Sequence, residues 1–437
     1  MKIYNIEEAK QTILKRKALH RMEYSPITLQ RTEDFFGSGI TPPQAVEIIL
    51  RSVEDEGDQA IQKWSKKLDG YDGEDIIIPK IKLKDAWDQL GLNLQEAMRD
   101  AVSRIRTFHQ MQPVKSWISD EMGGELGQRV TPIDSVGVYV PGGTAPLPSS
   151  VLMSVIPAQV AGVKNISIAT PPEPASSILA AAYLCGVDTI YQIGGAQAIA
   201  AFAFGSETVR KVNKIVGAGN LFVTLAKQQL FGVVGLDGLA GPTETMVIAD
   251  QSANPKWVAA DLLAQAEHDV QASAILLTTD PALAQAVAAE IGKQMKLLSR
   301  KEIIQASLNN AGGIVLVDTL DQAASLANEY GAEHLCLSVK YPKKLMQKIN
   351  NAGGFFLGDY SFEVLGDYIA GPSHVMPTSG TARFASPLNV LDFVKISSVV
   401  GLDTQTAAQL SVIAAKLADL ENLTAHAAAA RIRQEKK

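Results

Sequence analysis

The chain has 437 residues, which exceeds one typical domain and predicts two or three compact units around a large buried core. Its 40 Lys and Arg against 46 Asp and Glu give a net charge of −6, which argues against a nucleic-acid or other polyanionic partner. The two cysteines are far apart, and no segment resembles a signal peptide or approaches the roughly 18 apolar residues of a membrane span, so we expect a soluble, cytoplasmic protein without disulfides.

The first part of the chain carries mainly helical patterns. Residues 1 to about 35 are typical of a charged amphipathic helix followed by an arm. Thr41 then caps a helix that has two prolines in its first turn, where proline costs no intrahelical hydrogen bond. Between 117 and 140 the hydrophobic period shortens, and the glycine pair at 123–124 predicts a β-hairpin.

From residue 138 short apolar runs alternate with helical stretches, which predicts a parallel sheet flanked by helices. Ligands of such sheets collect where the strands end, and glycines at those ends would let backbone approach a phosphate. This indicates a dinucleotide site, although Phe222 stands where the third glycine of G-x-G-x-x-G belongs, so the glycine pattern alone leaves the cofactor open. The expected strands are 138–140, 166–168, 189–191 and 214–216, followed by Gly142, Gly143, Gly194, Gly195, Gly217 and Gly219.

A second series of alternating strands and helices begins near residue 245 and predicts a second sheet, with a cleft between the two. From about residue 389 the chain becomes alanine-rich and helical, and two amphipathic helices over 406–420 and 423–433 are expected to dock on another surface. The expected strands of the second sheet are 245–250, 274–277, 313–317 and 335–337.

A candidate metal site lies at the end of the helix expected after residue 255. Gln265 and His268 are three residues apart, so on a helix they project to nearly the same side and can share one ion or ligand. The pattern is not specific, because Gln-x-x-His also occurs at solvated helix ends. Other segments of the chain must decide its meaning.

Several motifs in the same order along the chain favour a metal site. With them the chain resembles the histidinol dehydrogenase family over nearly its whole length. They include Glu333-His334 before an apolar run, the loop from Gly366 to Thr378, and Leu423-Thr424-Ala425-His426. The remaining motifs are Val136 to Gly143, Ile193 to Ile199, and Gly217 to Asn220.

The patterns and the resemblance together predict an α/β fold. We expect two Rossmann-like parallel-sheet domains of an incomplete nucleotide-binding type, with a small N-terminal arm and a helical C-terminal extension. The expected parts are an arm at 1–34, a larger catalytic and zinc-binding domain at 35–138 and 242–388, an NAD-binding domain at 139–241, and a dimer-forming extension at 389–437.

The resemblance also implies the site residues. It maps one Zn²⁺ per subunit onto Gln265, His268, Asp367 and His426, and NAD contacts onto Tyr139, Gln197 and Asn220. Substrate contacts map onto the four zinc-binding residues with Thr243, His334 and Glu421, and the family's intertwined homodimer would supply His426 and Glu421 in trans.

This residue set suits the oxidation of L-histidinol through L-histidinal to L-histidine. A carboxamide, two neutral imidazoles and one carboxylate leave about one positive charge on zinc, so the metal can accept a neutral substrate imidazole. In the family the histidine of the pair is the general base, here His334. Removal of the hydroxyl proton and deprotonation of a water precede the two hydride transfers, and we expect Glu333 to activate that water.

Three alternatives stay open at this point. A related dehydrogenase could act on another small polar alcohol, and a zinc hydrolase could use Glu333 as its base without a nicotinamide. Within the dehydrogenase, Cys336 could trap the aldehyde covalently, although its apolar neighbours favour an inert buried thiol. The chain departs from common family residues at Thr243, Ala218, Ser373 and Asn422, and we interpret His374 as a hydrogen bonder that orders its loop.

Overall fold

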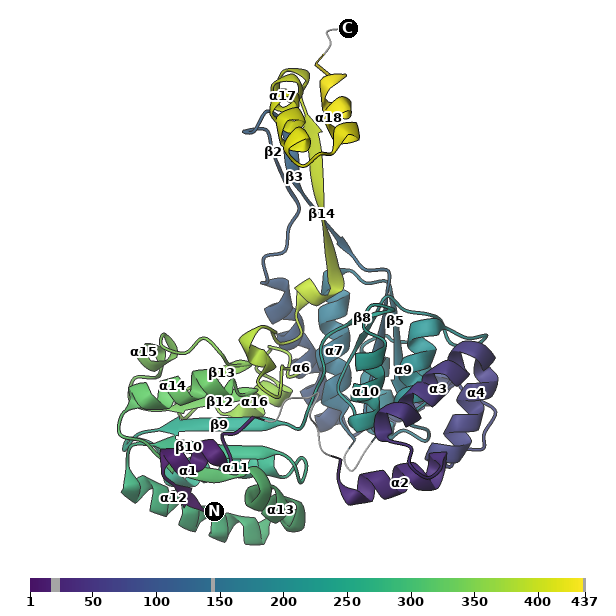
Figure 1. Cartoon of the computed structure of the whole chain (residues 1–437). Helices are drawn as coiled ribbons and strands as arrows, with labels where there is room; N and C mark the ends of the chain where they lie inside the picture. The colour runs from purple at the N-terminus through teal and green to yellow at the C-terminus, as the bar shows by residue number, and fades with distance from the viewer. Residues whose placement is uncertain (17–23, 143–145, 435–437) are drawn as a thin grey trace. The chain divides into compact units, whose positions relative to one another are not determined.

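A computed structural model describes residues 1–16, 24–142 and 146–434. The chain divides into two compact units, one formed by 1–111 with 134–392 and the other by 112–133 with 393–437 (Figure 1). The larger unit contains two parallel sheets, so the expected α/β architecture is confirmed. No helix among the described residues combines the length and the apolar character that a membrane crossing needs.

The first sheet of the larger unit has five parallel strands in the order β6-β5-β4-β7-β8. The chain order reverses beside β4, which lies between β5 and β7, and ligands of such sheets bind outside the strand ends at this point. The strands are β4 Ser135–Tyr139, β5 Asn165–Thr170, β6 Ile190–Gln192, β7 Lys214–Val216 and β8 Gly235–Leu236. The intervening helices are α7 Pro148–Ala161, α8 Ser176–Leu184, α9 Gly195–Phe204 and α10 Leu221–Gln229.

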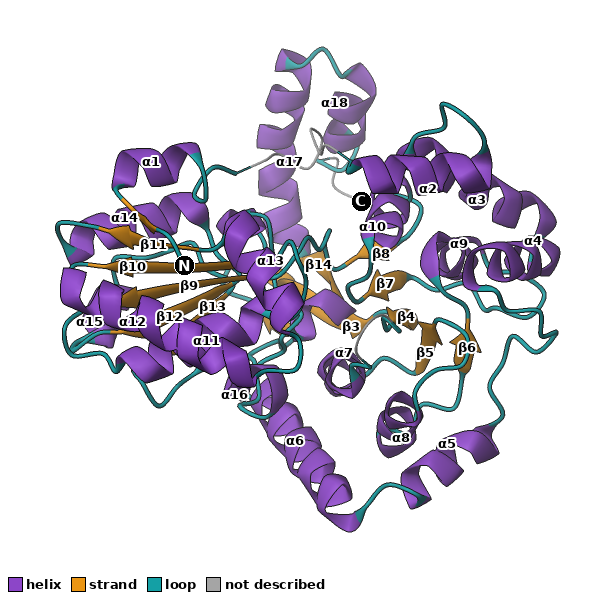
Figure 2. Cartoon of the chain, turned by 90° about the horizontal axis from the view of Figure 1, so that it is seen from below, coloured by secondary structure: helices purple, strands orange, loops and turns teal. Residues whose placement is uncertain are grey.

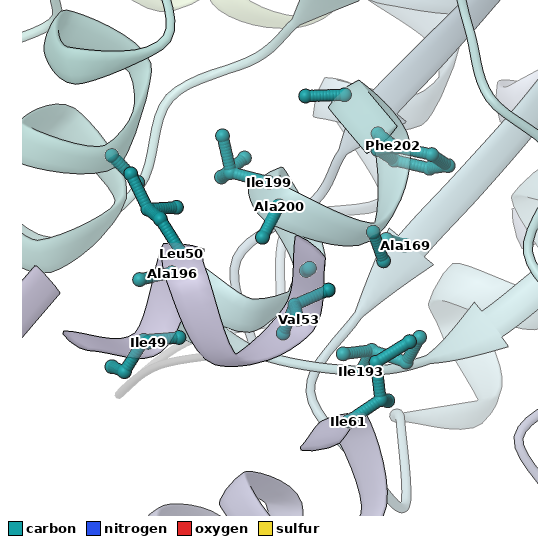
Figure 3. Packing of buried hydrophobic residues seen from close by; sticks show 14 of the residues in the cluster. Ile49, Leu50, Val53, Ile61, Ala169, Ile193, Ala196, Ile199, Ala200 and Phe202 are labelled. Carbon is teal, nitrogen blue, oxygen red and sulfur yellow. The ribbon is translucent and has the colours of Figure 1, made fainter. Parts of the chain in front are cut away.

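The helices that precede this sheet share its core. Helix α3 (Pro42–Glu56) packs against α9, and Leu50 and Val53 of α3 belong to one buried cluster with Ala196 and Ala200 of α9 (Figure 3). From the sequence we expected residues 35–138 to belong to the same domain as the second, six-stranded sheet. In the structure α3, which lies in this range, packs against the five-stranded sheet's helices, and β4 of that sheet begins at residue 135. The other helices in this part are α2 Pro26–Phe36, α4 Asp58–Trp64, α5 Lys80–Asp88 and α6 Leu92–Gln110.

The second sheet has six parallel strands in the order β1-β11-β10-β9-β12-β13, with helices on both faces (Figure 2). Alternate residues of β9 enter opposite cores: Met246 packs in the cluster that contains residues of α14, and Val247 packs with residues of α11 and α12. The strands are β1 Ile3–Tyr4, β9 Glu244–Ala249, β10 Ser273–Thr278, β11 Gly313–Leu316, β12 His334–Ser338 and β13 Gly354–Leu357. The helices are α1 Ile6–Gln11, α11 Pro255–Ala266, α12 Pro281–Gln294, α13 Lys301–Ala311, α14 Leu320–Tyr330, α15 Pro342–Met346 and α16 Glu363–Tyr368.

The N-terminal segment differs from the prediction of one long helix with an arm. Residues Ile3 and Tyr4 form the edge strand β1, which pairs with Ile314 and Val315 of β11. The following helix, α1, ends at Gln11. The start of the chain is therefore part of the six-stranded sheet.

The smaller unit is an antiparallel sheet with two helices. Strands β2 (Trp117–Ser119) and β3 (Gly124–Pro132) form the hairpin predicted at the glycine pair. The helical start predicted near residue 389 is wrong, because Val394–Leu402 forms the long strand β14 paired with β3. The two predicted C-terminal helices are confirmed as α17 Thr404–Leu420 and α18 Thr424–Arg431.

Candidate active site and metal centre

A cavity of about 620 Å³ in the larger unit collects the site residues predicted for the six-stranded sheet. Its wall includes Gly217 and Ala218, which follow β7, so it also reaches the end of a strand of the five-stranded sheet. The predicted site residues that line it are Thr243, Gln265, His268, Glu333, His334 and Asp367.

The strands of the six-stranded sheet contribute their amino ends to this cavity. Thr243 comes directly before β9, and His334 is the first residue of β12. Because β9 and β12 are parallel neighbours, with His334 opposite Thr245, the residues that start both strands lie together. This sheet therefore departs from the usual placement of ligands at the carboxyl ends of parallel strands.

His334 is buried among acidic groups. Its Nδ1 atom lies 3.6 Å from Glu333 Oε2 and 3.9 Å from Glu363 Oε1, and its Nε2 atom lies 3.4 Å from Asp367 Oδ1. Burial lowers the pKa of this imidazole, but the three carboxyl groups outweigh it and raise the pKa to about 10. Among the described residues, Nε2 is a buried polar atom without a hydrogen-bond partner, and its residue lines the cavity.

Glu333 is held at the start of the neighbouring strand. Its Oε2 atom accepts hydrogen bonds from Thr243 Oγ1 at 2.6 Å and from the Glu244 amide at 3.0 Å. Burial raises the pKa of Glu333 to about 7 despite these bonds. A carboxyl group with such a pKa can exchange a proton near neutral pH. Thr243, which stands where the family commonly has serine, keeps the hydroxyl that makes this bond.

Glu363 is a site residue that the sequence analysis missed. Its side chain is fully buried, accepts a hydrogen bond from Gln265 Nε2, and accepts another from Thr245 Oγ1 at 2.7 Å. Burial raises the pKa of Glu363 to about 8. The available signal was its spacing of four residues from Asp367, which places both carboxyl groups on one side of the short helix α16.

Three of these groups form a candidate metal centre. Ligand atoms of His334, Glu363 and Asp367 all lie within 4.8 Å of one another, a group that shares only Asp367 with the predicted zinc ligands. His268 is exposed as a residue but lines the same cavity, and desolvation of its ring by the neighbouring groups lowers its pKa, which favours the neutral imidazole that binds metals. The loop-ordering role expected for His374 is supported by its Nδ1 atom, which lies 2.8 Å from the carbonyl oxygen of Asp367.

The residues predicted to contact NAD lie at the carboxyl edge of the five-stranded sheet. Tyr139 ends β4, and its hydroxyl accepts a hydrogen bond from the Gly195 amide at 3.1 Å. Gln197 is fully buried, donates through Nε2 to Asp69 at 2.9 Å, and keeps an unpartnered Oε1 atom among the described residues. Asn220 caps α10 by accepting from two backbone amides. Gly143, which was also predicted to lie at this edge, is outside the described residues.

Gly217 at this edge is constrained by its neighbours. Its φ of 107° is in the region that favours glycine, and a Cβ there would lie 2.1 Å from the Tyr139 carbonyl oxygen. The Gly217 amide donates a hydrogen bond to Asp237 at 2.7 Å, and Lys227 donates one to the Gly217 carbonyl oxygen at 3.0 Å. The turn that borders the cavity is therefore fixed by a buried ion pair.

His426 and Glu421 belong to the smaller unit, where both side chains are exposed. Glu421 ends α17 and His426 is in the first turn of α18. Between them Asn422 has a φ of 59°, a conformation that favours glycine and that Asn adopts more readily than most other residues.

Cys336 has the properties of an inert buried thiol. It is 3% exposed, packs in the apolar core of the six-stranded sheet, and its Sγ atom lies 3.9 Å from Glu363 Oε2. Burial raises its pKa well above the usual range, so little of the nucleophilic thiolate is present. It is not among the described residues that line the cavity.

Two parallel sheets and a shared cavity with buried histidine and carboxyl groups define the chain as an α/β enzyme with a candidate metal centre. Residues 40–434 match the histidinol dehydrogenase family. The chain belongs to this family of oxidoreductases, as the resemblance implied.

Named relatives agree with this assignment along most of the chain. The histidinol dehydrogenase of Halalkalibacterium halodurans is 48% identical over 397 residues, which cover 90% of this chain and 93% of the relative. That of Thermus thermophilus is 48% identical over 394 residues, covering 90% and 95%. The crystal structure of the enzyme from Elizabethkingia anophelis superposes with a TM-score of 0.90 at 35% identity, covering 99% of this chain and 98% of that one.

Proposed function

We propose that this protein oxidises L-histidinol through L-histidinal to L-histidine with NAD, in the histidine biosynthesis that the family name implies. The observation that carries the proposal is the Nε2 atom of His334, which is buried, belongs to a cavity-lining residue and has no hydrogen-bond partner among the described residues. Such an atom is suited to receive a proton from a substrate hydroxyl. The free, buried cysteines support a reducing cytoplasm as the place of action.

A zinc ion fits the donor set of the cavity. Two buried carboxyl groups and the partly buried Asp367 surround one imidazole, and a cation would offset their excess negative charge. We propose Gln265, His268, Asp367 and His426 as its ligands. When bound, zinc supplies a Lewis acid that holds a neutral nitrogen ligand such as the substrate imidazole.

Proton transfer belongs to the Glu333-His334 pair. A cation bound by Asp367 would reduce the pull of that carboxylate on the His334 proton, which lowers the imidazole pKa from about 10 toward neutrality. His334 then accepts the hydroxyl proton in the first oxidation. Glu333, with a pKa raised to about 7, removes a proton from the water that adds to the aldehyde.

The proposed NAD site follows the carboxyl edge of the five-stranded sheet. Tyr139, Gln197 and Asn220 lie on the segments that end or follow β4, β6 and β7, where the strand order reverses. NAD, when bound there, accepts the hydride from the substrate carbon in each oxidation. The buried Gln197 Oε1 atom has no hydrogen-bond partner among the described residues, which supports a polar ligand at this edge.

We propose that the protein is a homodimer in which His426 and Glu421 complete the site of the other subunit. Support comes from the exposed apolar side chains of α17, since Leu410, Ile413 and Leu417 are 44%, 55% and 58% exposed. A contiguous apolar surface of this kind is typical of an association surface. Thr243 and His334 would contact the substrate from the larger unit.

A substrate panel tests this proposal. The purified protein, loaded with zinc, is mixed with NAD and either histidinol or other small polar alcohols, and reduced nicotinamide is followed by absorbance. Histidinol should give the largest kcat/KM. Signal with a different alcohol only would select a related dehydrogenase, and amide or ester hydrolysis without any nicotinamide signal would select the zinc hydrolase.

A further inference from the structure

We propose that Arg16, after helix α1, is a positioning residue for the reaction: through Glu244 it holds the backbone groups that orient His334 and Glu333. The inference rests on the proposed function. No sequence motif indicates a role for Arg16 at the site, because its carboxylate partner Glu244 is 228 positions away in the sequence.

The guanidinium group of Arg16 makes hydrogen bonds to a carboxylate and to two backbone carbonyl groups, and it stacks on a tyrosine ring. Two of its nitrogens donate to the two carboxylate oxygens of Glu244, with Nη2 at 2.8 Å from Oε2. Its Nε and Nη2 atoms also donate to the carbonyl oxygen of Tyr330 at 2.9 and 2.8 Å, and Nη2 reaches that of Gly331 at 3.2 Å. The Arg16 Cζ atom lies 3.5 Å from the centre of the Tyr330 ring. A forked, stacked cation fixes its partners in a way that lysine cannot reproduce.

Glu244 connects this cation to both proposed catalytic residues through its backbone. Its amide donates to Glu333 Oε2 at 3.0 Å, and its carbonyl oxygen lies 3.2 Å from His334 Nδ1. Its side chain is 7% exposed and also accepts a hydrogen bond from the Ser379 amide at 3.0 Å. A shift of Glu244 would therefore move a contact of Glu333 and a contact of His334 together.

Arg16 also contacts the site through hydrogen bonds to the carbonyl oxygens of Tyr330 and Gly331. They belong to the turn between α14 and Glu333, where Gly331 has a φ of 60°. Arg16 thus links the amino end of β9, through Glu244, with the turn that leads into β12. These are the two strand ends that carry the proposed proton-transfer groups.

The same contacts bear on which ring nitrogen of neutral His334 carries the proton. Three acceptor oxygens surround Nδ1, from Glu244 at 3.2 Å, Glu333 at 3.6 Å and Glu363 at 3.9 Å. Gln265 Nε2 also lies 3.2 Å from Nδ1, and Asp367 Oδ1 lies 3.4 Å from Nε2, but the proposed zinc would engage both of these residues. With zinc bound, we therefore expect the Glu244 carbonyl oxygen to hold the proton on Nδ1 and to leave Nε2 as the base. Arg16, by fixing Glu244, stabilises the nearest of these acceptors.

Chemical rescue of Arg16→Ala tests the proposal. Arg16 is partly exposed, at 20%, so a small guanidinium ion can enter the space left by the side chain. We expect kcat with histidinol to fall between about 10- and 100-fold while KM for NAD stays nearly unchanged, because the cofactor residues are elsewhere. Millimolar guanidinium should restore much of the loss, and methylammonium at the same ionic strength should not. Arg51→Ala is the matched control, since its ion pair with Glu47 is exposed and its activity should not change.

A second readout does not depend on turnover. Nitrogen NMR of the zinc-loaded protein, with the His334 signals assigned through His334→Asn, should show a proton on Nδ1 in the native chain and a mixed tautomer in Arg16→Ala. Full activity of folded Arg16→Ala, equal rescue by both cations, or an unchanged tautomer would each overturn the proposal. If Arg16→Ala fails to fold, Arg16→Lys replaces it, and native kcat and tautomer in that variant would contradict a role for the forked contact. A native chain that does not oxidise histidinol would refute the proposed function separately.

Discussion

Replacing Glu333 by Gln should separate the two oxidations, because only the second consumes water. The amide keeps an oxygen that can accept the hydrogen bonds from Thr243 and the Glu244 amide, at 2.6 and 3.0 Å in the native chain, so the site should stay in place. It cannot accept a proton. General-base catalysis contributes roughly 10²- to 10⁴-fold, so oxidation of added histidinal should slow by at least about 100-fold. Oxidation of histidinol to the aldehyde, which uses His334, should slow by less than about tenfold.

Rapid-mixing single turnovers started from histidinol or from histidinal measure the two steps separately. Since a base must be deprotonated and burial raises the pKa of Glu333 to about 7, the native rate of aldehyde oxidation should rise with pH up to about 7. Glu333→Gln should lack this rise. Glu329→Gln, at a side chain that is 69% exposed, is the matched control and should behave like the native chain. Equal losses in both steps would refute the assignment of Glu333 to water activation.

The remaining predictions concern the thiol, the metal, the dimer and the core. Cys336→Ser should keep most of the activity, because its thiol is buried and protonated, and complete inactivation would revive the covalent route. His268→Ala should lose both bound zinc and turnover, and a normal zinc content by metal analysis would remove His268 from the ligands. Co-expressed His334→Ala and His426→Ala chains should recover about a quarter of native activity if His426 acts in trans, and confirmed mixed dimers without recovery would place it in cis. Phe202→Ala, at a fully buried ring, should lower the free energy of unfolding by about 3–5 kcal/mol in urea titrations, whereas a change under about 1 kcal/mol would contradict the tight packing of that core.

The strand and helix alternation predicted both parallel sheets because their strands are short, buried apolar runs between helices. Four strands, β1, β8, β13 and β14, were not predicted, and two of them show the physical reason. β1 is only two residues long, and its pairing with β11 depends on residues more than 300 positions away. β14 is mostly exposed and contains serines, so its pairing with β3 is not visible in its own hydrophobic pattern.

The site was predictable where local spacing or a family motif carried the information. The three-residue spacing of Gln265 and His268 paired them, although α11 ends at Ala266 and His268 lies in the turn after it. Glu333-His334 belongs to a recognisable motif. Glu363 was missed because a carboxyl group in a short apolar segment gives no local sign of burial, and Arg16 because its partners are brought to it only by the fold. Positioning residues of this kind depend on long-range contacts that a single sequence does not display.

One active site is proposed to carry histidinol through two successive hydride transfers to histidine. The most direct measurement is the amount of reduced NAD formed per histidinol consumed by the purified, zinc-loaded protein, with the product identified by mass spectrometry. We predict two molecules of reduced NAD per histidinol and histidine as the product. One reduced NAD per histidinol with accumulating aldehyde, or no reduced NAD, would rule out two successive oxidations at this site.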